Sequence, residues 1–216
     1  MRQRKVKNVE TKINEVTQYY IADARLWRGR WHELFGNDGG VYLEIGCGKG
    51  NFILAKARAH PDQNFVGIEG QPSVVFRAMQ KLAATELTNV RLTQAFVRQP
   101  GEWFAAGELS GLYLNFSDPW QKKRHAHRRL THRAYWRQYG ELLRPGGTIE
   151  IKTDDEAFFA FMEAEARAVA SDLFQIAQRT EDLHQSALEA KGFRSEYEDK
   201  FCEAGKRIKY AQFVRL

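Results

Sequence analysis

The chain has 216 residues, and its 33 lysines and arginines outnumber its 27 aspartates and glutamates, for a formal net charge of +6. This length suits one well-buried domain, and the basic balance favours a polyanionic partner, because Lys and Arg release counterions when they bind phosphates. Cys47 and Cys202 are the only cysteines, too few for a disulfide scaffold and without the spacing of a zinc site, so we expect a reducing, cytoplasmic location.

The first 20 residues are polar and basic and have no sustained apolar period. We therefore expect a single domain over residues 1–216 that begins with a mobile basic arm, residues 1–20. No apolar run follows the charged start, so neither a signal peptide nor a membrane anchor is expected. From residue 21 to residue 35 the apolar side chains recur at helical spacing, which predicts a helix that ends at the glycine-rich segment 36–40.

After residue 40 the pattern alternates between short β-rich runs and longer helical ones. Strands are predicted at 41–45, 64–68, 90–93, 111–116, 147–152, 174–179 and 206–215. Helices are predicted at 51–59, 73–85, 131–142 and 155–171, with a weak one at 102–106. This alternation predicts a doubly wound α/β fold with a mostly parallel sheet. No helix is expected between residues 179 and 206, so the last two strands should form an antiparallel pair at one edge.

A glycine-rich turn follows the first predicted strand, with Gly46, Gly48 and Gly50 at alternate positions after Glu44. Such glycines let the backbone approach a ligand closely, although many similar turns are purely structural. Glu69 closes the next strand, where a carboxylate can accept both hydroxyls of a ribose. The spacing is not the G-x-G-x-x-G of dinucleotide folds, and Glu44 would repel a pyrophosphate but attract an ammonium group. The pattern favours S-adenosylmethionine over NAD.

The segment Asn115 to Leu130 joins the end of a predicted strand to a lone carboxylate, Asp118, and then to a dense run of cations. In open α/β sheets, ligands bind at the carboxyl ends of the strands, which is where Asp118 would lie. Asp118 could equally cap a loop before Pro119, and the cations could form an ordinary solvated face. The cations of this run are Lys122, Lys123, Arg124, Arg128 and Arg129.

The block DPWQKKRHAHRRL, followed by KTD at 152–154, resembles the bacterial tRNA (guanine-N7-)-methyltransferases, and the likeness extends from about Val41 to the C-terminus. It implies a Rossmann-like class I methyltransferase fold with a seven-stranded sheet, helices on both faces and an antiparallel edge strand. It also implies S-adenosylmethionine as methyl donor, no metal, and tRNA as partner, with the guanine at position 46 of the variable loop as acceptor. Relatives are consistent with a monomer or a homodimer.

The resemblance assigns roles to single residues of this chain. It places Glu44, Glu69 and Asp118 in the cofactor pocket, with Asp118 also catalytic. It places Lys122 and Asp154 at the substrate, together with a segment that we expect to be a polar loop, Ser195, Glu196, Tyr197 and Glu198. Asp154 would also suit a helix N-cap.

Two residues depart from the family pattern: Gln121 stands where Pro is usual, and Phe96 occupies the place of a polar residue that meets adenine. Phe96 would stack on adenine or turn into the core. These departures leave open a second hypothesis, an RNA-binding module that keeps the fold without turnover. A third, a nicotinamide oxidoreductase, is disfavoured by the glycine spacing and by the lack of room for a substrate domain.

Guanine N7 has a free lone pair, so methyl transfer needs no general base, and alignment of the reactants should dominate. Asp118 can then hold the base and stabilise the positive charge that arrives on the purine. Lys123, Arg124, Arg128 and Arg129 are expected to contact tRNA phosphates. Trp120 would stack on a base or anchor the loop. His125 and His127 lack the carboxylate or Cys partners of a metal site.

Overall fold

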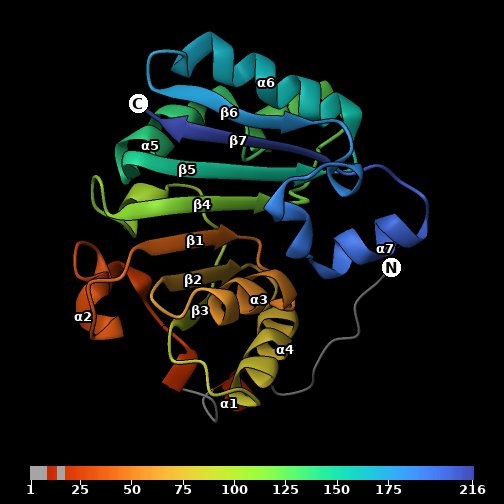
Figure 1. Cartoon of the computed structure of the whole chain (residues 1–216). Coiled ribbons are helices and arrows are strands. Elements are labelled where there is room, and N and C mark those ends of the chain that lie inside the picture. The colour runs from red at the N-terminus through yellow and green to blue at the C-terminus, as the bar shows by residue number, and fades with distance from the viewer. Residues whose placement is uncertain (1–8, 14–17) are drawn as a thin grey trace.

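The computed structural model describes residues 9–13 and 18–216. Its centre is one seven-stranded sheet in the order β3-β2-β1-β4-β5-β7-β6 (Figure 1). The strands are β1 (Val41–Ile45), β2 (Asn64–Glu69), β3 (Val90–Gln94), β4 (Leu109–Asn115), β5 (Leu143–Thr153), β6 (Phe174–Thr180) and β7 (Lys209–Arg215). All seven predicted strands are confirmed to within a few residues.

The five strands from β3 to β5 are parallel, and β7 runs antiparallel to both of its neighbours. The antiparallel pair predicted at this edge is therefore confirmed. The strand that runs against the others is β7, which is inserted between β5 and β6, so the strand at the edge itself is β6. The insertion brings the start of β7 beside the carboxyl ends of the parallel strands.

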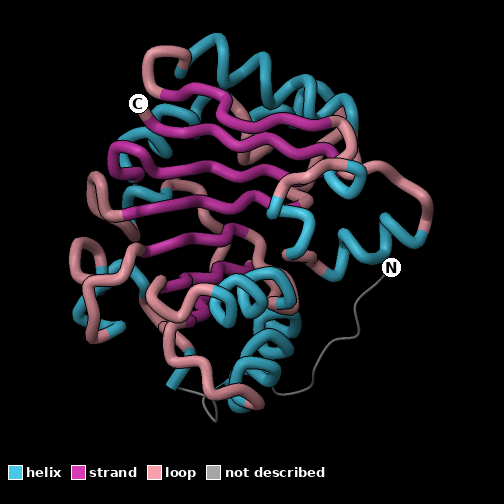
Figure 2. Tube along the Cα trace, viewed as in Figure 1, coloured by secondary structure: helices cyan, strands magenta, loops and turns pink. Residues whose placement is uncertain are grey.

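Helices cover both faces of the sheet (Figure 2). The α-helices are α1 (Val9–Ile13), α2 (Trp31–Phe35), α3 (Asn51–Ala59), α4 (Pro72–Ala83), α5 (Arg133–Leu142), α6 (Glu156–Ala170) and α7 (Glu196–Glu203). One core joins β1 and β4 to α2, α5 and α6, and a second core joins the opposite face to α1, α3 and α4. The predicted helices α3 to α6 are confirmed, whereas the weak one at 102–106 is replaced by a short 3-10 helix, η3 (Pro100–Glu102).

Side-chain alternation along β1 decides which face of the sheet Glu44 lies on. Val41, Leu43 and Ile45 pack into the core beside α5 and α6. Because successive strand side chains face opposite sides of a sheet, Glu44 points to the face covered by α3. It pairs in register with Tyr113 of β4, which belongs to that second core.

The helix predicted over residues 21–35 is wrong as a single element. A 3-10 helix, η2 (Ala24–Trp27), and α2 are separated at Gly29, whose φ of 77° lies in the left-handed region. Trp31, which follows the break, is fully buried against Phe104, with 5.1 Å between the ring centroids. The apolar spacing of the sequence therefore continues across Gly29 although the helix does not. Leu26, which a continuous stripe would bury, is 71% exposed.

Part of the predicted N-terminal arm is ordered on the domain. Val9–Ile13 forms α1, and Ile13 is 5% exposed in the core shared with α3 and α4. Tyr20 forms a parallel bridge with Leu92 of β3. The prediction of an arm also covers residues 1–8 and 14–17, which lie outside the described residues.

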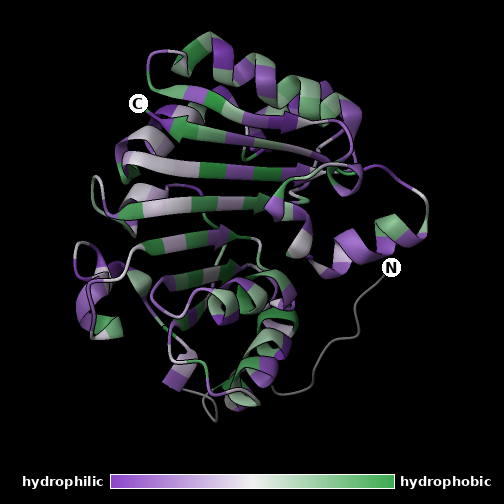
Figure 3. Cartoon of the chain, viewed as in Figure 1, coloured by the Kyte–Doolittle hydropathy of each residue, from purple (hydrophilic) through white to green (hydrophobic). Residues whose placement is uncertain are grey.

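The segment between β6 and β7 holds the largest surprise of the fold. We expected no helix there, yet two 3-10 helices, η5 (Leu183–Gln185) and η6 (Glu189–Gly192), precede α7. In Figure 1 the segment crosses from the β6 edge to the ends of β1 and β4, where α7 lies beside α3 and α4. The ion pair of Glu196 with Lys81 of α4, 2.7 Å, fixes that position. Figure 3 shows α7 as largely hydrophilic, which explains why an apolar period did not reveal it.

Candidate active site

The glycine-rich turn lies at the carboxyl edge of the sheet, between β1 and α3. Gly46, Gly48 and Gly50 all have positive φ, at 82°, 57° and 84°. The turn is fixed to the neighbouring strand, because the backbone N–H groups of Gly46 and Cys47 donate to the carbonyl of Ile68, at 2.7 and 3.0 Å. A Cβ on Gly48 would meet nothing within 4 Å. The left-handed backbone therefore favours glycine at position 48, and the space beside it is open to a ligand.

A buried and incompletely paired carboxylate lies beneath this turn. Glu44 is 1% exposed, and its Oε1 accepts a hydrogen bond from Asn115 Nδ2 at 2.8 Å. Within the described part of the chain, Glu44 Oε2, Asn115 Oδ1 and Ser117 Oγ have no hydrogen-bond partner. Burial raises the pKa of Glu44 to about 8. Buried acceptors without partners are costly, so this cluster is suited to a cationic donor such as an ammonium group.

Glu69 ends β2 on the other side of the turn. Its carboxylate accepts from the backbone N–H groups of Gly48, 3.1 Å, and Gln71, 2.8 Å. Burial raises the pKa of Glu69, and the charge of Asp118 contributes in the same direction. Glu69 and Asp118 are therefore close enough for their charges to interact. Asp118 itself is exposed, and the described structure gives it no hydrogen bond or ion pair.

The loop after β4 has two non-glycine residues with positive φ, Phe116 at 52° and Trp120 at 40°. Such backbone conformations are uncommon outside glycine and persist where the surroundings impose them. Trp120 is half-buried, edge-on to His125 at 5.8 Å between ring centroids and under the Arg128 guanidinium at 5.0 Å. It anchors the loop, which was one of the two roles considered for it.

Gln121 and Arg129 hold the same loop from outside. Gln121 Nε2 donates to Asp155 Oδ2 at 2.6 Å, so this residue ties the loop to the start of α6 without the usual proline. Arg129 donates to the carbonyls of Pro119, 2.7 Å, and Trp120, 3.2 Å, and stacks on Phe161 at 4.2 Å. Two of the N–H groups of Arg129 are thus used within the protein, and its contact with a tRNA phosphate stays a prediction.

The remaining cations of the run form the short 3-10 helix η4 (Lys123–Arg128) and the residue before it. Lys122, Lys123, Arg124 and Arg128 are exposed and form no ion pair with a carboxylate among the residues that the structure describes. Arg124 donates only to the ring of His125, at 3.3 Å. This leaves four cationic side chains available beside Asp118.

Asp154 lies at the end of β5 and pairs with Lys206. The helix N-cap considered for it is formed by Asp155 instead, whose side chain accepts from Phe158 N at 2.7 Å. Asp154 is thus free of a capping role and lies at the same edge of the sheet as Asp118, as predicted.

The segment expected to be a polar loop is instead the N-cap and first turn of α7. Ser195 is the N-cap, accepting from Glu198 N at 3.1 Å. Glu198 is 0% exposed and bound to Lys152 at 3.0 Å, so it presents no surface to a substrate in this conformation. Glu196 lies near the glycine-rich turn, where its charge raises the pKa of Glu44. Tyr197 is 51% exposed and stacks on Phe201.

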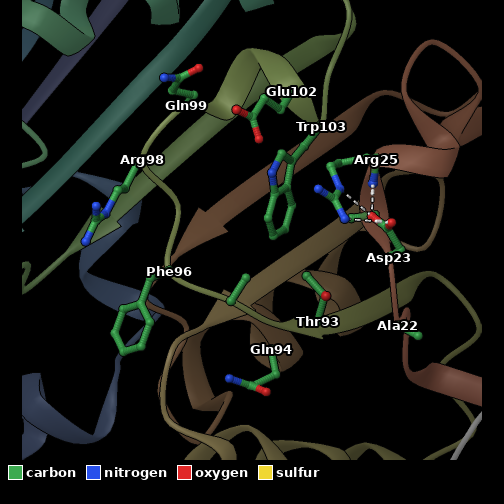
Figure 4. A pocket seen from close by; sticks show the side chains of 12 residues that line it. Ala22, Asp23, Arg25, Thr93, Gln94, Phe96, Arg98, Gln99, Glu102 and Trp103 are labelled. Atoms are coloured by element: carbon green, nitrogen blue, oxygen red, sulfur yellow. Dashed lines mark hydrogen bonds and ion pairs between the residues drawn. The ribbon is translucent and has the colours of Figure 1, made fainter.

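Phe96 follows β3 and is 71% exposed, so it does not turn into the core. A Cβ on Gly70 would lie 2.2 Å from a Phe96 ring atom, so the ring covers the backbone just after Glu69. Figure 4 shows Phe96 at one side of a cavity of about 430 Å³, with Trp103 and the paired Asp23 and Arg25 further along its wall. Sequence reasoning did not place the segment before α2 beside this site.

Two further findings concern the residues that the structure covers, 9–13 and 18–216. They contain no group of three or more His, Cys, Asp or Glu side chains arranged to hold a metal ion. None of their helices is long and apolar enough to cross a membrane.

The family is established by comparison with known proteins. A family model described as a putative methyltransferase matches residues 38–211. The chain belongs to this methyltransferase family. The tRNA (guanine-N(7)-)-methyltransferase of Geobacillus thermodenitrificans (strain NG80-2) is 45% identical over 215 residues, covering 100% of this chain and 98% of that protein. The protein of the same name from Brevibacillus brevis is 39% identical over 208 residues, covering 96% and 95%.

Solved structures confirm the methyltransferase fold. An antibiotic-related methyltransferase superposes with a TM-score of 0.59 at 19% identity, covering 87% of this chain and 92% of that chain. A putative rRNA methylase from Clostridium thermocellum superposes with a TM-score of 0.55 at 13% identity, covering 99% and 98%. At these identities the likeness concerns the fold alone.

Proposed function

We propose that this methyltransferase transfers the methyl group of S-adenosylmethionine to N7 of guanine in tRNA, at position 46 of the variable loop. The name of its curated relatives supports the reaction, and one feature of the site supports the cofactor: Glu44 Oε2 is buried beneath a glycine-rich turn without a partner among the residues that the structure describes. An amino acid group bound there would supply the missing donor.

The residues around the turn fit the whole cofactor. Glu44 would hold the ammonium end, Glu69 would accept the ribose hydroxyls, and Gly46, Gly48 and Gly50 would let the backbone pass close to both. Phe96, whose exposed ring covers Gly70, would lie against the adenine. When bound, the sulfonium supplies an electrophilic methyl group that needs no metal.

The protein's contribution to the chemistry is alignment and charge. Guanine N7 is already a free nucleophile, so the site needs to hold the base in line with the methyl group and away from water. Asp118 is exposed and has no partner in the described structure, so its oxygens are available to accept from the guanine N–H groups and to stabilise the cationic product. Lys122 and Asp154 would contact the substrate, and Lys123, Arg124 and Arg128 the tRNA backbone.

The strain of the loop favours this role for Asp118. Positive φ at Phe116 and Trp120 brackets Asp118, and Gln121 and Arg129 tie the loop down on its far side. A carboxylate held in this way loses little conformational freedom when it binds a base, which is how a catalytic group gains from preorganisation.

The test is direct: incubate the protein with S-adenosylmethionine and a tRNA transcript that has guanine at position 46, then map N7-methylguanosine by chemical cleavage. We expect cleavage at that position alone and none in a transcript with adenine there. Methylation at another guanine would refute position 46 as the methylated nucleotide. Tight tRNA binding without any transfer would refute the reaction and support an RNA-binding module.

A further inference from the structure

The segment between β6 and β7 lines a second cavity, of about 250 Å³ and open to solvent, at the end of α7. A water molecule occupies roughly 30 Å³ in the liquid, so the space exceeds a single water several-fold. Three cations line it, Arg194, Lys206 and Arg207, with His184 between them and Asp182 as the carboxylate. Cationic side chains therefore outnumber carboxylates in its lining.

The cations differ in how far the protein already neutralises them. Arg207 is exposed, and the described residues give it neither a hydrogen bond nor an ion pair. Arg194 lies 3.6 Å from Asp199, beyond good hydrogen-bond distance. Asp182 uses its side chain to cap η5, by accepting from Gln185 N at 3.4 Å. Lys206 is paired with Asp154, so among the described residues Arg207 is the lining cation without a partner.

A buried chain of charged groups holds the wall of the cavity in place. The ring of His184 lies between Arg194, 3.2 Å from its Nδ1, and Glu198, 3.0 Å from its Nε2. Glu198 is fully buried and paired with Lys152 of β5, whose Nζ also donates to the carbonyls of Ala190, 2.7 Å, and Phe193, 2.6 Å. Of the lining cations, Arg194 is thereby connected to β5 through His184 and Glu198, which limits its freedom as in a preorganised binding site.

The cavity adjoins the candidate active site. Lys206, in its lining, pairs with Asp154 at the end of β5. On the other side of β5, Gln121 connects the loop that bears η4 to Asp155. Asp154 thus lies between two groups of cations, η4 on one side and the cavity on the other. A nucleic acid strand that passes Asp154 would meet both.

We propose that this cavity binds a backbone phosphate of the RNA substrate, next to the nucleotide that enters the active site. The inference rests on the proposed function, since it assumes an RNA whose guanine lies between Asp118 and Asp154. Arg207 and Arg194 donate to the phosphate oxygens, and Lys206 stays paired with Asp154 beside them. Phosphate contacts of this kind fix the register of the strand without selecting its sequence.

The experiment compares Arg207→Gln and Arg194→Gln with a control of equal charge, Arg137→Gln. Arg137 lies on α5 and pairs with Asp172 just before β6, at the opposite end of the strands from the cavity. Dissociation constants for a full-length tRNA transcript are measured for the intact protein and each variant over a series of salt concentrations. Thermal unfolding of each variant confirms that it is folded.

Each lost phosphate contact reduces the slope of log K against log salt by about 0.7 to 0.9. We expect this reduction for Arg207→Gln and Arg194→Gln, with unchanged S-adenosylmethionine affinity, and no reduction for Arg137→Gln. Equal slopes in all variants would overturn the inference. The outcome is independent of catalysis: a protein that binds tRNA but transfers no methyl group refutes the proposed reaction and leaves this comparison intact.

Discussion

Replacing Lys152 by methionine should destabilise the protein more than most single substitutions. Its ammonium group is 1% exposed and donates to two backbone carbonyls, and it is the cation paired with Glu198, which is itself 0% exposed. Burial lowers the pKa of Lys152, although Glu198 beside it opposes that effect. The pair connects β5 to α7, so its loss acts on the position of the whole segment between β6 and β7.

The magnitude follows from what the substitution leaves behind. Methionine matches the length of lysine but leaves the Glu198 carboxylate buried with only His184 beside it. Removing one partner of a buried ion pair costs about 3–5 kcal/mol, because the remaining charge is neither solvated nor compensated. The matched control is Arg137→Met, in the exposed pair with Asp172, whose contribution should be about 0–1 kcal/mol.

Urea unfolding of the two single variants, of Glu198→Gln and of the double variant Lys152→Met with Glu198→Gln provides the assay. Removing the second charge should recover part of the loss, with a coupling of about 1–3 kcal/mol between the two sites. The reasoning is refuted if Lys152→Met costs less than about 1 kcal/mol, or if the losses of the single variants simply add in the double variant.

Three further predictions concern the turn, the loop and the core. Because burial raises the pKa of Glu44 to about 8, its stabilising contribution is complete below pH 4.5 and is lost as the pH rises through 8. At pH 7 this carboxyl is largely protonated, so S-adenosylmethionine binding should release a proton, which calorimetry in different buffers detects and Glu44→Gln abolishes. Asp118→Asn should reduce kcat at least tenfold with an unchanged melting temperature, and equal kcat would exclude a catalytic role. Gly67→Ala places a Cβ 2.7 Å from Leu92 Cδ2 and should cost about 1–3 kcal/mol, whereas Gly192→Ala, with open space around it, should cost under about 0.5 kcal/mol by chemical denaturation.

The sequence predicted the strands well, because each is a short apolar run between turn residues, and burial in the sheet requires that pattern. It failed over residues 21–35, where the apolar spacing is preserved although Gly29 breaks the helix. Periodicity reports which side chains are buried, and two short helices around a left-handed glycine can bury them as well as one long helix can.

Helix α7 was not predicted, although the sequence contains a helix-capping pattern at its start. Ser195-Glu196-Tyr197-Glu198 has the S-x-x-E spacing of a helix start, and the structure shows Ser195 capping the backbone of Glu198. The pattern was interpreted only as part of a substrate site. An apolar period could not find α7, because its one buried residue is a glutamate that is paired with Lys152.

Site residues were predictable where the strand ends alone position them. Glu44, Glu69, Asp118 and Asp154 follow or end strands of one parallel sheet, so their meeting at its carboxyl edge follows from the fold. Arg129 was not predictable in this way, because its donors turn back to the carbonyls of Pro119 and Trp120. A run of cations does not reveal which members the protein uses for itself.

The sequence by itself determined the sheet, the glycine-rich turn and the order of the carboxylates, since these depend on local patterns and on the geometry of parallel strands. The tertiary structure alone decided that Glu44 is buried without a full set of partners among the described residues, that Glu198 is buried and paired with Lys152, and that Arg194 and Arg207 share a cavity. The physical reason is that burial and pairing depend on contacts between residues far apart in the chain: Lys152 lies 46 positions from Glu198 and 41 from Phe193.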